Sequence, residues 1–162
     1  MTFAKQFASQ YPREIAIQDD SQRLSWDLVD DVLNRCANGL QSADLGPSNR
    51  IAVFAENSVE TALANLGGLV AGASVVPVNF HLTAEEVAYI LSDSEARVLF
   101  VGPETAERGL MAAAQSSVHT VIGWGDSGVD IDWVDWLAAA DGAEPDQTVP
   151  PRPNLLYTSG TT

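Results

Sequence analysis

The last six residues of the chain, Tyr157-Thr158-Ser159-Gly160-Thr161-Thr162, combine residue types that suit phosphate binding. Hydroxyl side chains donate hydrogen bonds to phosphate oxygens, and a glycine lets the backbone turn its N–H groups toward an anion. The candidate phosphate-binding residues are Thr158, Ser159, Gly160, Thr161 and Thr162. Composition alone also suits an ordinary polar loop, so the upstream sequence has to decide between the two interpretations.

The charge of the chain restricts which partners it can bind. Acidic residues number 22 against 8 basic ones, the net charge is -14, and Lys5 is the only lysine. Such a surface repels nucleic acid and anionic lipid head groups. We therefore expect no nucleic-acid partner, and a polyanionic ligand would need backbone N–H groups, a metal ion or residues outside this chain.

Cysteine and histidine are too scarce to build a metal or disulfide framework. Cys36 is the only cysteine, which excludes an internal disulfide and a thiolate cluster. Its place on the apolar side of a helix predicts a core residue. His81 and His119 are each predicted to be structural hydrogen-bonding residues rather than metal ligands or catalytic groups.

No segment predicts membrane insertion or secretion. Met1 to Gln10 lacks the pattern of a signal peptide, so a cytoplasmic location is the default expectation. The uncharged stretch Ala62–Val78 approaches the length of a membrane span, but polar residues, the Gly67–Gly68 pair and Pro77 interrupt it. A buried helix that leads into a buried strand explains this stretch better.

Short apolar runs alternate with helical periodicity along most of the chain. Strands are predicted at Ile15–Ile17, Arg23–Ser25, Ile51–Ala55, Val75–Val78, Val98–Val101 and Thr120–Ile122. Helices are predicted before Tyr11-Pro12, from Trp26 to the Gly46-Pro47 stop, and over Asn57–Gly72, Thr83–Leu91, Pro103–Ser116 and Asp132–Ala140. This order predicts an α/β fold with a mainly parallel sheet flanked by helices.

Several side chains carry specific structural expectations. Ser25, Asn57 with Glu60, and Thr83 with Glu86 are predicted helix caps. Asn34 is expected on the solvated side of its helix, and the Gly67–Gly68 pair is expected to allow close backbone packing. Among the tryptophans, Trp26, Trp133 and Trp136 are expected to pack against the sheet, and Trp124 to be partly exposed.

The chain divides into three predicted parts. Residues 1–141 form an α/β subdomain, residues 142–154 form a linker rich in Pro, Asp and Gly, and residues 155–162 form a strand that enters the phosphate-binding segment. The strand is expected at Leu155-Leu156-Tyr157.

Several segments together resemble the adenylate-forming superfamily, which includes acyl-CoA synthetases, firefly-type luciferases and the adenylation domains of peptide synthetases. The final segment resembles the family's phosphate loop, aromatic-Thr-Ser-Gly-Ser/Thr-Thr followed by Gly, a variable residue, Pro and Lys, and this chain contains the first six positions. Upstream matches are Leu24–Leu28 to LTYxEL, Leu45–Phe54 to GLxxGDRVAV, Asn57–Glu60 to NSxE, Gly72–Asn79 to GAVVVPVN, and His81–Leu91 to RLTxxELxYIL. His81 stands where many relatives have arginine, and the upstream segments look most like those of CoA ligases.

The resemblance implies the N-terminal subdomain of an ATP-dependent acyl-CoA synthetase. Such an enzyme uses ATP, Mg²⁺ and coenzyme A to convert a small carboxylic acid to an acyl-adenylate and then to an acyl-CoA. The loop residues would grip the β- and γ-phosphates. The loop lysine, the magnesium ligand and the acyl pocket lie downstream in the family, so no catalytic residue is assigned, and the chain alone is expected to be inactive.

Two other interpretations stay open at this point. The chain could be a naturally shortened, non-catalytic paralogue that binds partners, or copies of itself, through a sheet edge left open at Thr162. A nucleotide-binding α/β domain of another class is disfavoured, because the chain contains neither G-x-G-x-x-G after its strands nor G-x-x-x-x-G-K-[ST].

Overall fold

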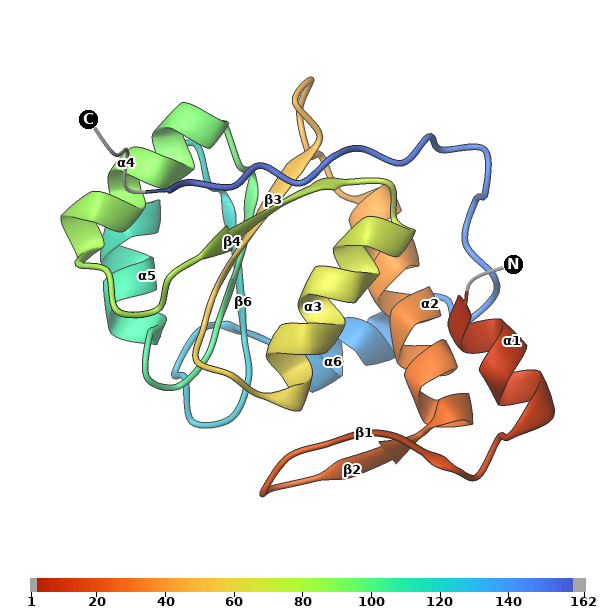
Figure 1. The fold of residues 1–162 in the computed structure, drawn as a ribbon. Coiled ribbons are helices and arrows are strands. Elements are labelled where there is room, and N and C mark those ends of the chain that lie inside the picture. The colour runs from red at the N-terminus through yellow and green to blue at the C-terminus, as the bar shows by residue number, and fades with distance from the viewer. Residues whose placement is uncertain (1–2, 159–162) are drawn as a thin grey trace.

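The computed structural model describes residues 3–158 and shows an α/β architecture (Figure 1). The helices in this range are α1 (Phe3–Gln10), α2 (Trp26–Ser42), α3 (Val59–Val70), α4 (Ala84–Ser94), α5 (Ala106–Ala113) and α6 (Trp133–Ala139). The strands are β1 (Ile15–Gln18), β2 (Arg23–Ser25), β3 (Arg50–Phe54), β4 (Ser74–Val78), β5 (Val98–Val101), β6 (Thr120–Gly123) and β7 (Ile131–Asp132). The predicted fold class is confirmed, while α5 is shorter than expected and β7 was not predicted.

A five-stranded sheet with the order β4-β3-β5-β6-β7 forms the centre of the molecule, and every pair in it is parallel. Ile51 of β3 pairs with Val75 of β4 on one side and with Val98 of β5 on the other. The chain thus moves outward from β3 to β4 and then returns past β3 to β5. β4 is consequently one edge of the sheet.

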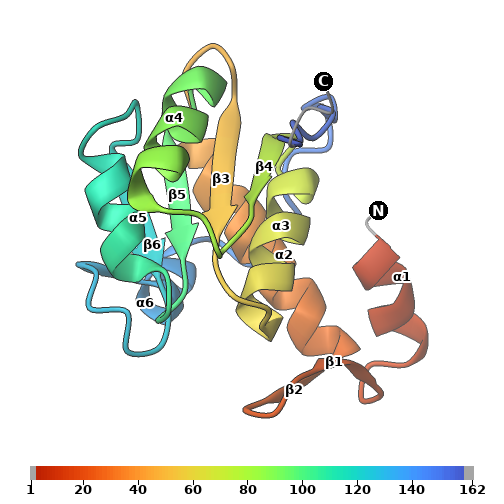
Figure 2. The same ribbon diagram turned by 60° about the vertical axis from the view of Figure 1, so that its left-hand side comes forward.

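Helices cover both faces of this sheet (Figure 2), and alternate strand residues belong to separate cores. Ile51 and Val53 contribute to the core formed with α2, α3 and α6. Ala52 and Phe54 contribute to the core formed with α4 and α5. Because β3 is apolar on both faces, it reads in the sequence as a continuous apolar run.

The Gly67–Gly68 pair allows α3 to approach its neighbours closely, as predicted. A Cβ atom added at Gly67 would lie 2.3 Å from the Sγ atom of Cys36 on α2. A Cβ atom added at Gly68 would lie 2.5 Å from the Cδ1 atom of Ile51 in the sheet. The pair therefore serves packing of α3 against both α2 and β3.

Helix starts follow the predicted chemistry at one of three sites. Thr83 and Glu86 form the predicted capping box at the start of α4. α3 is capped by Ser58, whose side chain accepts from the N–H of Thr61, so the prediction of Asn57 and Glu60 was wrong by one position. Ser25 precedes α2 but its hydroxyl bonds the side chain of Asp27 instead of capping the helix.

Three side chains lie in surroundings that differ from the prediction. Asn34 is buried within α2 rather than exposed, and Trp124 is also buried, with its ring edge-on to Trp133. Trp26 stacks on Phe7 of α1 at 4.7 Å between ring centroids and does not join the sheet. Trp133 and Trp136 do pack beside Phe100 of β5, as predicted.

The N-terminal hairpin lies apart from the main sheet (Figure 1). β1 and β2 pair antiparallel, and Asp19 closes their turn by accepting from the N–H groups of Ser21 and Gln22. The other carboxylate oxygen of Asp19 accepts from the N–H of Val59 at 2.9 Å, which ties the hairpin to the start of α3. None of the helices in the described part of the chain has both the length and the apolar character needed to cross a bilayer.

Candidate functional site

The residues that approach the predicted phosphate-binding segment form a long tail, residues 140–158, which contains no helix or strand. The tail leaves α6, passes α2, follows the outer edge of β4 and reaches α4 (Figure 1). Thr158 is exposed near the tail's end. Ser159, Gly160, Thr161 and Thr162 lie outside the described residues. The division of the chain at residues 141 and 154 stays a prediction.

The tail lies beside β4 but does not extend the sheet. The Ser74 hydroxyl donates to the carbonyl oxygen of Pro153 at 2.7 Å, and the N–H of Leu155 donates to the carbonyl oxygen of Val75 at 3.0 Å. The next ladder bond along this edge would need an N–H at position 77, and Pro77 has none. The predicted strand at Leu155–Tyr157 was therefore wrong: the segment is extended but bonded at a single residue.

Tyr157 attaches the tail to α4. Its hydroxyl donates to the Oδ2 atom of Asp93 at 2.6 Å. Leu155 and Tyr157 both pack against the core on the α4 and α5 side of the sheet, whereas Leu156 between them is 65% exposed. Partial burial, together with the carboxylate of Asp93, raises the pKa of Tyr157 to about 12. The hydroxyl thus stays protonated and able to donate at neutral pH.

An apolar hollow of about 620 Å³ lies beside Thr158, between α4, the end of β4 and the tail. Its lining residues are Asn79, Leu82, Glu85, Glu86, Tyr89, Ile90, Tyr157 and Thr158. The charged members of this lining are both acidic. Phosphate groups bound next to it would need positive charge from a metal ion, from backbone N–H groups or from residues outside this chain.

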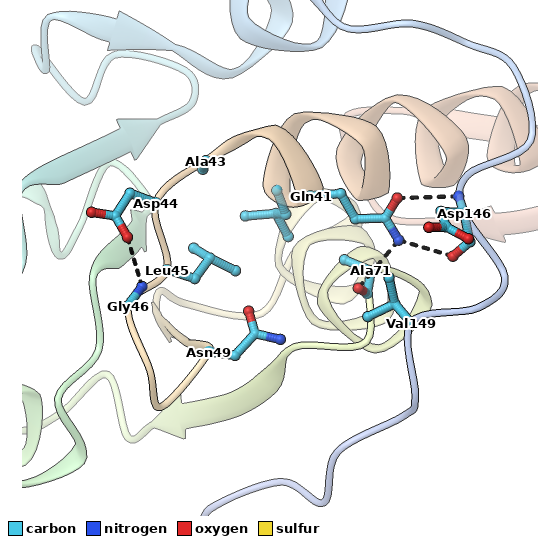
Figure 3. A pocket seen from close by; sticks show the side chains of 10 residues that line it. Gln41, Ala43, Asp44, Leu45, Gly46, Asn49, Ala71, Asp146 and Val149 are labelled. Carbon is cyan, nitrogen blue, oxygen red and sulfur yellow. Dashed lines mark hydrogen bonds between the residues drawn. The ribbon is translucent and has the colours of Figure 1, made fainter.

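A second hollow of about 390 Å³ lies at the opposite end of the sheet, where the tail crosses α2 (Figure 3). The Gln41 amide donates to the carbonyl oxygens of Ala71 and Asp146 and accepts from the N–H of Asp146. The Asp44 carboxylate accepts from the N–H of Gly46. Gln41 thus joins α2 to the end of α3 and to the tail, and Asp44 closes its own loop, so this hollow is a structural junction.

His119 and Cys36 have the structural surroundings that were predicted, whereas the His81 ring makes an aromatic contact in place of the predicted hydrogen bond. The His81 ring packs on Phe80 at 4.0 Å between centroids, and the Nε2 atom of His119 bonds the carbonyl oxygen of Asp44. Burial raises the pKa of the Cys36 thiol far above its ordinary range. Within residues 3–158, no three His, Cys, Asp or Glu side chains converge as metal ligands.

Comparison with known proteins decides the family. The family described as AMP-binding enzyme matches residues 4–162, which is nearly the whole chain. The chain belongs to the AMP-binding enzyme family.

Relatives within the AMP-binding enzyme family include fatty-acid ligases. The chain is 33% identical to the long-chain-fatty-acid–CoA ligase FadD13 of Mycobacterium tuberculosis over 98% of its own length and 32% of the relative. It is 32% identical to the fatty acid–[acyl-carrier-protein] ligase ScoC of Streptomyces coeruleorubidus, covering 96% of this chain and 29% of that protein. The chain thus spans about a third of the length of these relatives.

Solved structures support the same fold. The N-terminal domain of FACL13 from Mycobacterium tuberculosis superposes with a TM-score of 0.80 at 32% identity, covering 98% of this chain and 40% of that one. The anthranilate CoA ligase AuaEII has a TM-score of 0.86 at 21% identity, covering 98% of this chain and 32% of that one. The latter likeness shows the fold alone.

Asp93 is a contact residue at this site that sequence reasoning missed. It lies near the end of α4, in the stretch that matches the AMP-binding enzyme family, and by its type it resembles any exposed acidic residue on a helix. Its partner Tyr157 is 64 residues away in the sequence. Only the path of the tail along β4 brings the two side chains together.

Proposed function

We propose that this chain forms the N-terminal part of an ATP-dependent acyl-CoA synthetase, an acid–thiol ligase that acts on a fatty acid or another small carboxylic acid. The match of residues 4–162 to the AMP-binding enzyme family carries this proposal. The similarity to FadD13 and ScoC over 98% and 96% of this chain favours a fatty acid as the substrate class.

The proposed reaction has two steps. A carboxylate oxygen of the acid attacks the α-phosphorus of ATP, and the bond to the bridging oxygen breaks, so that pyrophosphate leaves and an acyl-adenylate forms. The thiol sulfur of coenzyme A then attacks the acyl carbon, the bond from that carbon to the AMP oxygen breaks, and the thiol proton is released.

The phosphate-binding segment would act in the first step. In this proposal Thr158, Ser159, Gly160, Thr161 and Thr162 bind the β- and γ-phosphates and stabilise the charge of the leaving pyrophosphate. Mg²⁺ would supply additional positive charge. This need is pronounced here, because Glu85 and Glu86 lie on the hollow next to Thr158.

The chain by itself is proposed to be inactive, since none of its residues is assigned a catalytic role. Acid-dependent exchange of labelled pyrophosphate into ATP measures the first step. We expect no exchange from the 162-residue chain, and exchange from a longer protein whose reading frame continues past Thr162. Exchange by the 162-residue chain alone would refute the inactivity, and no exchange by the longer protein with any of a panel of fatty and aromatic acids would refute the ligase.

The alternative of a non-catalytic module that pairs through an open sheet edge has less support. The outer edge of β4 is where Leu155 already donates to Val75 and Ser74 bonds Pro153. Concentration-dependent self-association of the purified chain in analytical ultracentrifugation would favour the alternative. A monomer at all concentrations would count against it.

A further inference from the structure

We propose that Tyr157 and Asp93 form a latch that positions the start of the phosphate-binding segment against α4, which makes both of them positioning residues for ATP. The latch is the hydrogen bond from the Tyr157 hydroxyl to the Asp93 carboxylate. The inference rests on the proposed function, because Tyr157 directly precedes the candidate phosphate-binding residues and would position them for ATP.

The sheet does not hold the described part of the tail beyond Leu155. In a parallel ladder the N–H and C=O of one residue point to the same edge of the strand. The carbonyl oxygen of Leu155 should therefore receive a hydrogen bond from position 77, but Pro77 has no N–H. Beyond Leu155, the latch is the hydrogen bond that fixes the described end of the tail.

Helix α4 is held firmly at both ends and so gives the latch a fixed partner. Its first turn is closed by the capping box of Thr83 and Glu86, and Leu91 and Ser94 near its end are fully buried. The guanidinium of Arg50 at the start of β3 donates to the carbonyl oxygen of Ser94 at 2.8 Å. The end of α4 that carries Asp93 is thus joined to β3, the strand next to β4 in the sheet.

The chemistry of the contact between Tyr157 and Asp93 also favours a positioning role. A hydrogen bond to an ionised carboxylate is shorter and stronger than one between neutral groups, and the latch is 2.6 Å long. The tyrosine ring packs against the apolar core beside α4, so its orientation is restricted before the hydroxyl bonds. One side chain therefore fixes both the position and the direction of the chain as it reaches Thr158.

The first test measures the tail directly in the 162-residue chain. Tyr157→Phe and Asp93→Ala each remove the bond, whereas Asp93→Asn keeps a carbonyl oxygen as acceptor. Amide hydrogen exchange at residues 154–158 should become roughly 2- to 10-fold faster in the first two variants, the range for loss of one hydrogen bond, and change less in Asp93→Asn. Exchange in β5 should not change. Tyr11→Phe, which alters an exposed tyrosine beyond α1, is the matched control.

The second test replaces the missing ladder bond. Pro77→Val introduces an N–H at the position that faces Leu155, so Pro77→Val combined with Tyr157→Phe should restore slow exchange in the tail. Unchanged exchange in Tyr157→Phe would overturn the latch. A failure of Pro77→Val to restore protection would contradict the role given to Pro77.

The third test separates the latch from the proposed function. In the longer protein, Tyr157→Phe and Asp93→Ala should raise the KM for ATP roughly 2- to 10-fold, with kcat at saturating ATP within about twofold, and Asp93→Asn should stay near the unsubstituted protein. An unchanged KM in an active protein would overturn the latch alone. Absence of pyrophosphate exchange in the unsubstituted longer protein would refute the proposed function. The amide hydrogen exchange of the tail would then decide alone whether the latch exists.

Discussion

The central strands and the C-terminal tail are both extended and apolar in part, yet they are held in different ways. Each residue from Ile51 to Phe54 of β3 pairs with β4 on one side and with β5 on the other, and both faces of the strand are covered. Within the described residues, the tail is bonded to the backbone of β4 at Leu155 and is otherwise held through side chains, such as those of Ser74 on β4 and Asp93 on α4. The candidate phosphate-binding residues therefore follow a part of the chain that lacks the continuous backbone pairing of the sheet.

Side chains of α1 and α2 hold the first part of the tail. The Asn38 amide donates to the carbonyl oxygens of Asp141 and Ala143, both at 2.8 Å. Lys5 on α1 forms an ion pair with Glu144 at 3.1 Å. Exposed ion pairs of this kind contribute little to stability, so we expect the tail to open without unfolding of the sheet.

The largest expected effect comes from truncating a buried side chain in the core beside the sheet. Phe100 of β5 is fully buried in the core between the sheet and α6, with its ring centroid 5.7 Å from those of both Trp133 and Trp136. Phe100→Ala should lower the free energy of unfolding by about 3–5 kcal/mol, measured by urea denaturation followed by tryptophan fluorescence. The matched tail variant Leu156→Ala should change it by less than about 0.5 kcal/mol. Similar losses of unfolding free energy in the two variants would contradict the proposed difference between the sheet and the tail.

The next effect tests close packing between α2 and α3. Gly67→Ala gains about 1 kcal/mol of helix propensity but places a Cβ atom 2.3 Å from the Sγ atom of Cys36. Overpacking costs about 1–3 kcal/mol, so we expect a net loss of stability in urea denaturation. Cys36→Ala combined with Gly67→Ala should recover part of that loss. A more stable Gly67→Ala variant would show that the contact is not restrictive.

A smaller effect is expected where α2 holds the tail. Gln41→Ala removes the amide that bonds both the N–H and the carbonyl oxygen of Asp146. Each such bond contributes about 1 kcal/mol, and the loss should be local: faster amide exchange at residues 143–149 with unchanged exchange in β3. Equal acceleration in β3 would mean that the tail and the sheet open as one unit. Gln115→Ala, on the far side of the sheet, is a suitable control.

The smallest expected effect is a loss of amide exchange protection in the tail at acidic pH. Hydrogen bonds from the Thr148 N–H and hydroxyl lower the pKa of Asp146 below 3.8, and the hydrogen bond from Lys5 lowers the pKa of Glu144 below 4.5. Carboxylates with a lowered pKa stabilise the attached tail above those values, and the stabilisation is lost as pH falls through the lowered pKa. Exchange protection at residues 143–149, corrected for the intrinsic pH dependence, should therefore fall between pH 5 and pH 3 before protection in β5 does. Asp146→Asn should weaken this pH dependence, and an unchanged profile in that variant would contradict the assignment.

Much of the sheet was predictable because its signals are local and repeated. The apolar runs at Ile51–Ala55 and Val98–Val101 mark strands that are buried on both faces, and the capping box at Thr83 marks the start of α4. The two residues of β7 carry no such signal. The prediction for Asn34 was wrong because the helix period places it on the polar side of α2 but does not reveal which neighbouring elements cover that side.

The sequence by itself determined the α/β class, the order of the elements, the acidic surface and the family resemblance, because periodicity, caps and short motifs are properties of neighbouring residues. Only the tertiary structure decided how the tail is held. Pro77 interrupts the ladder along β4, and Tyr157 meets Asp93 across 64 residues of sequence. Both outcomes depend on which segment lies along the edge of the sheet, and that is set by packing between distant parts of the chain.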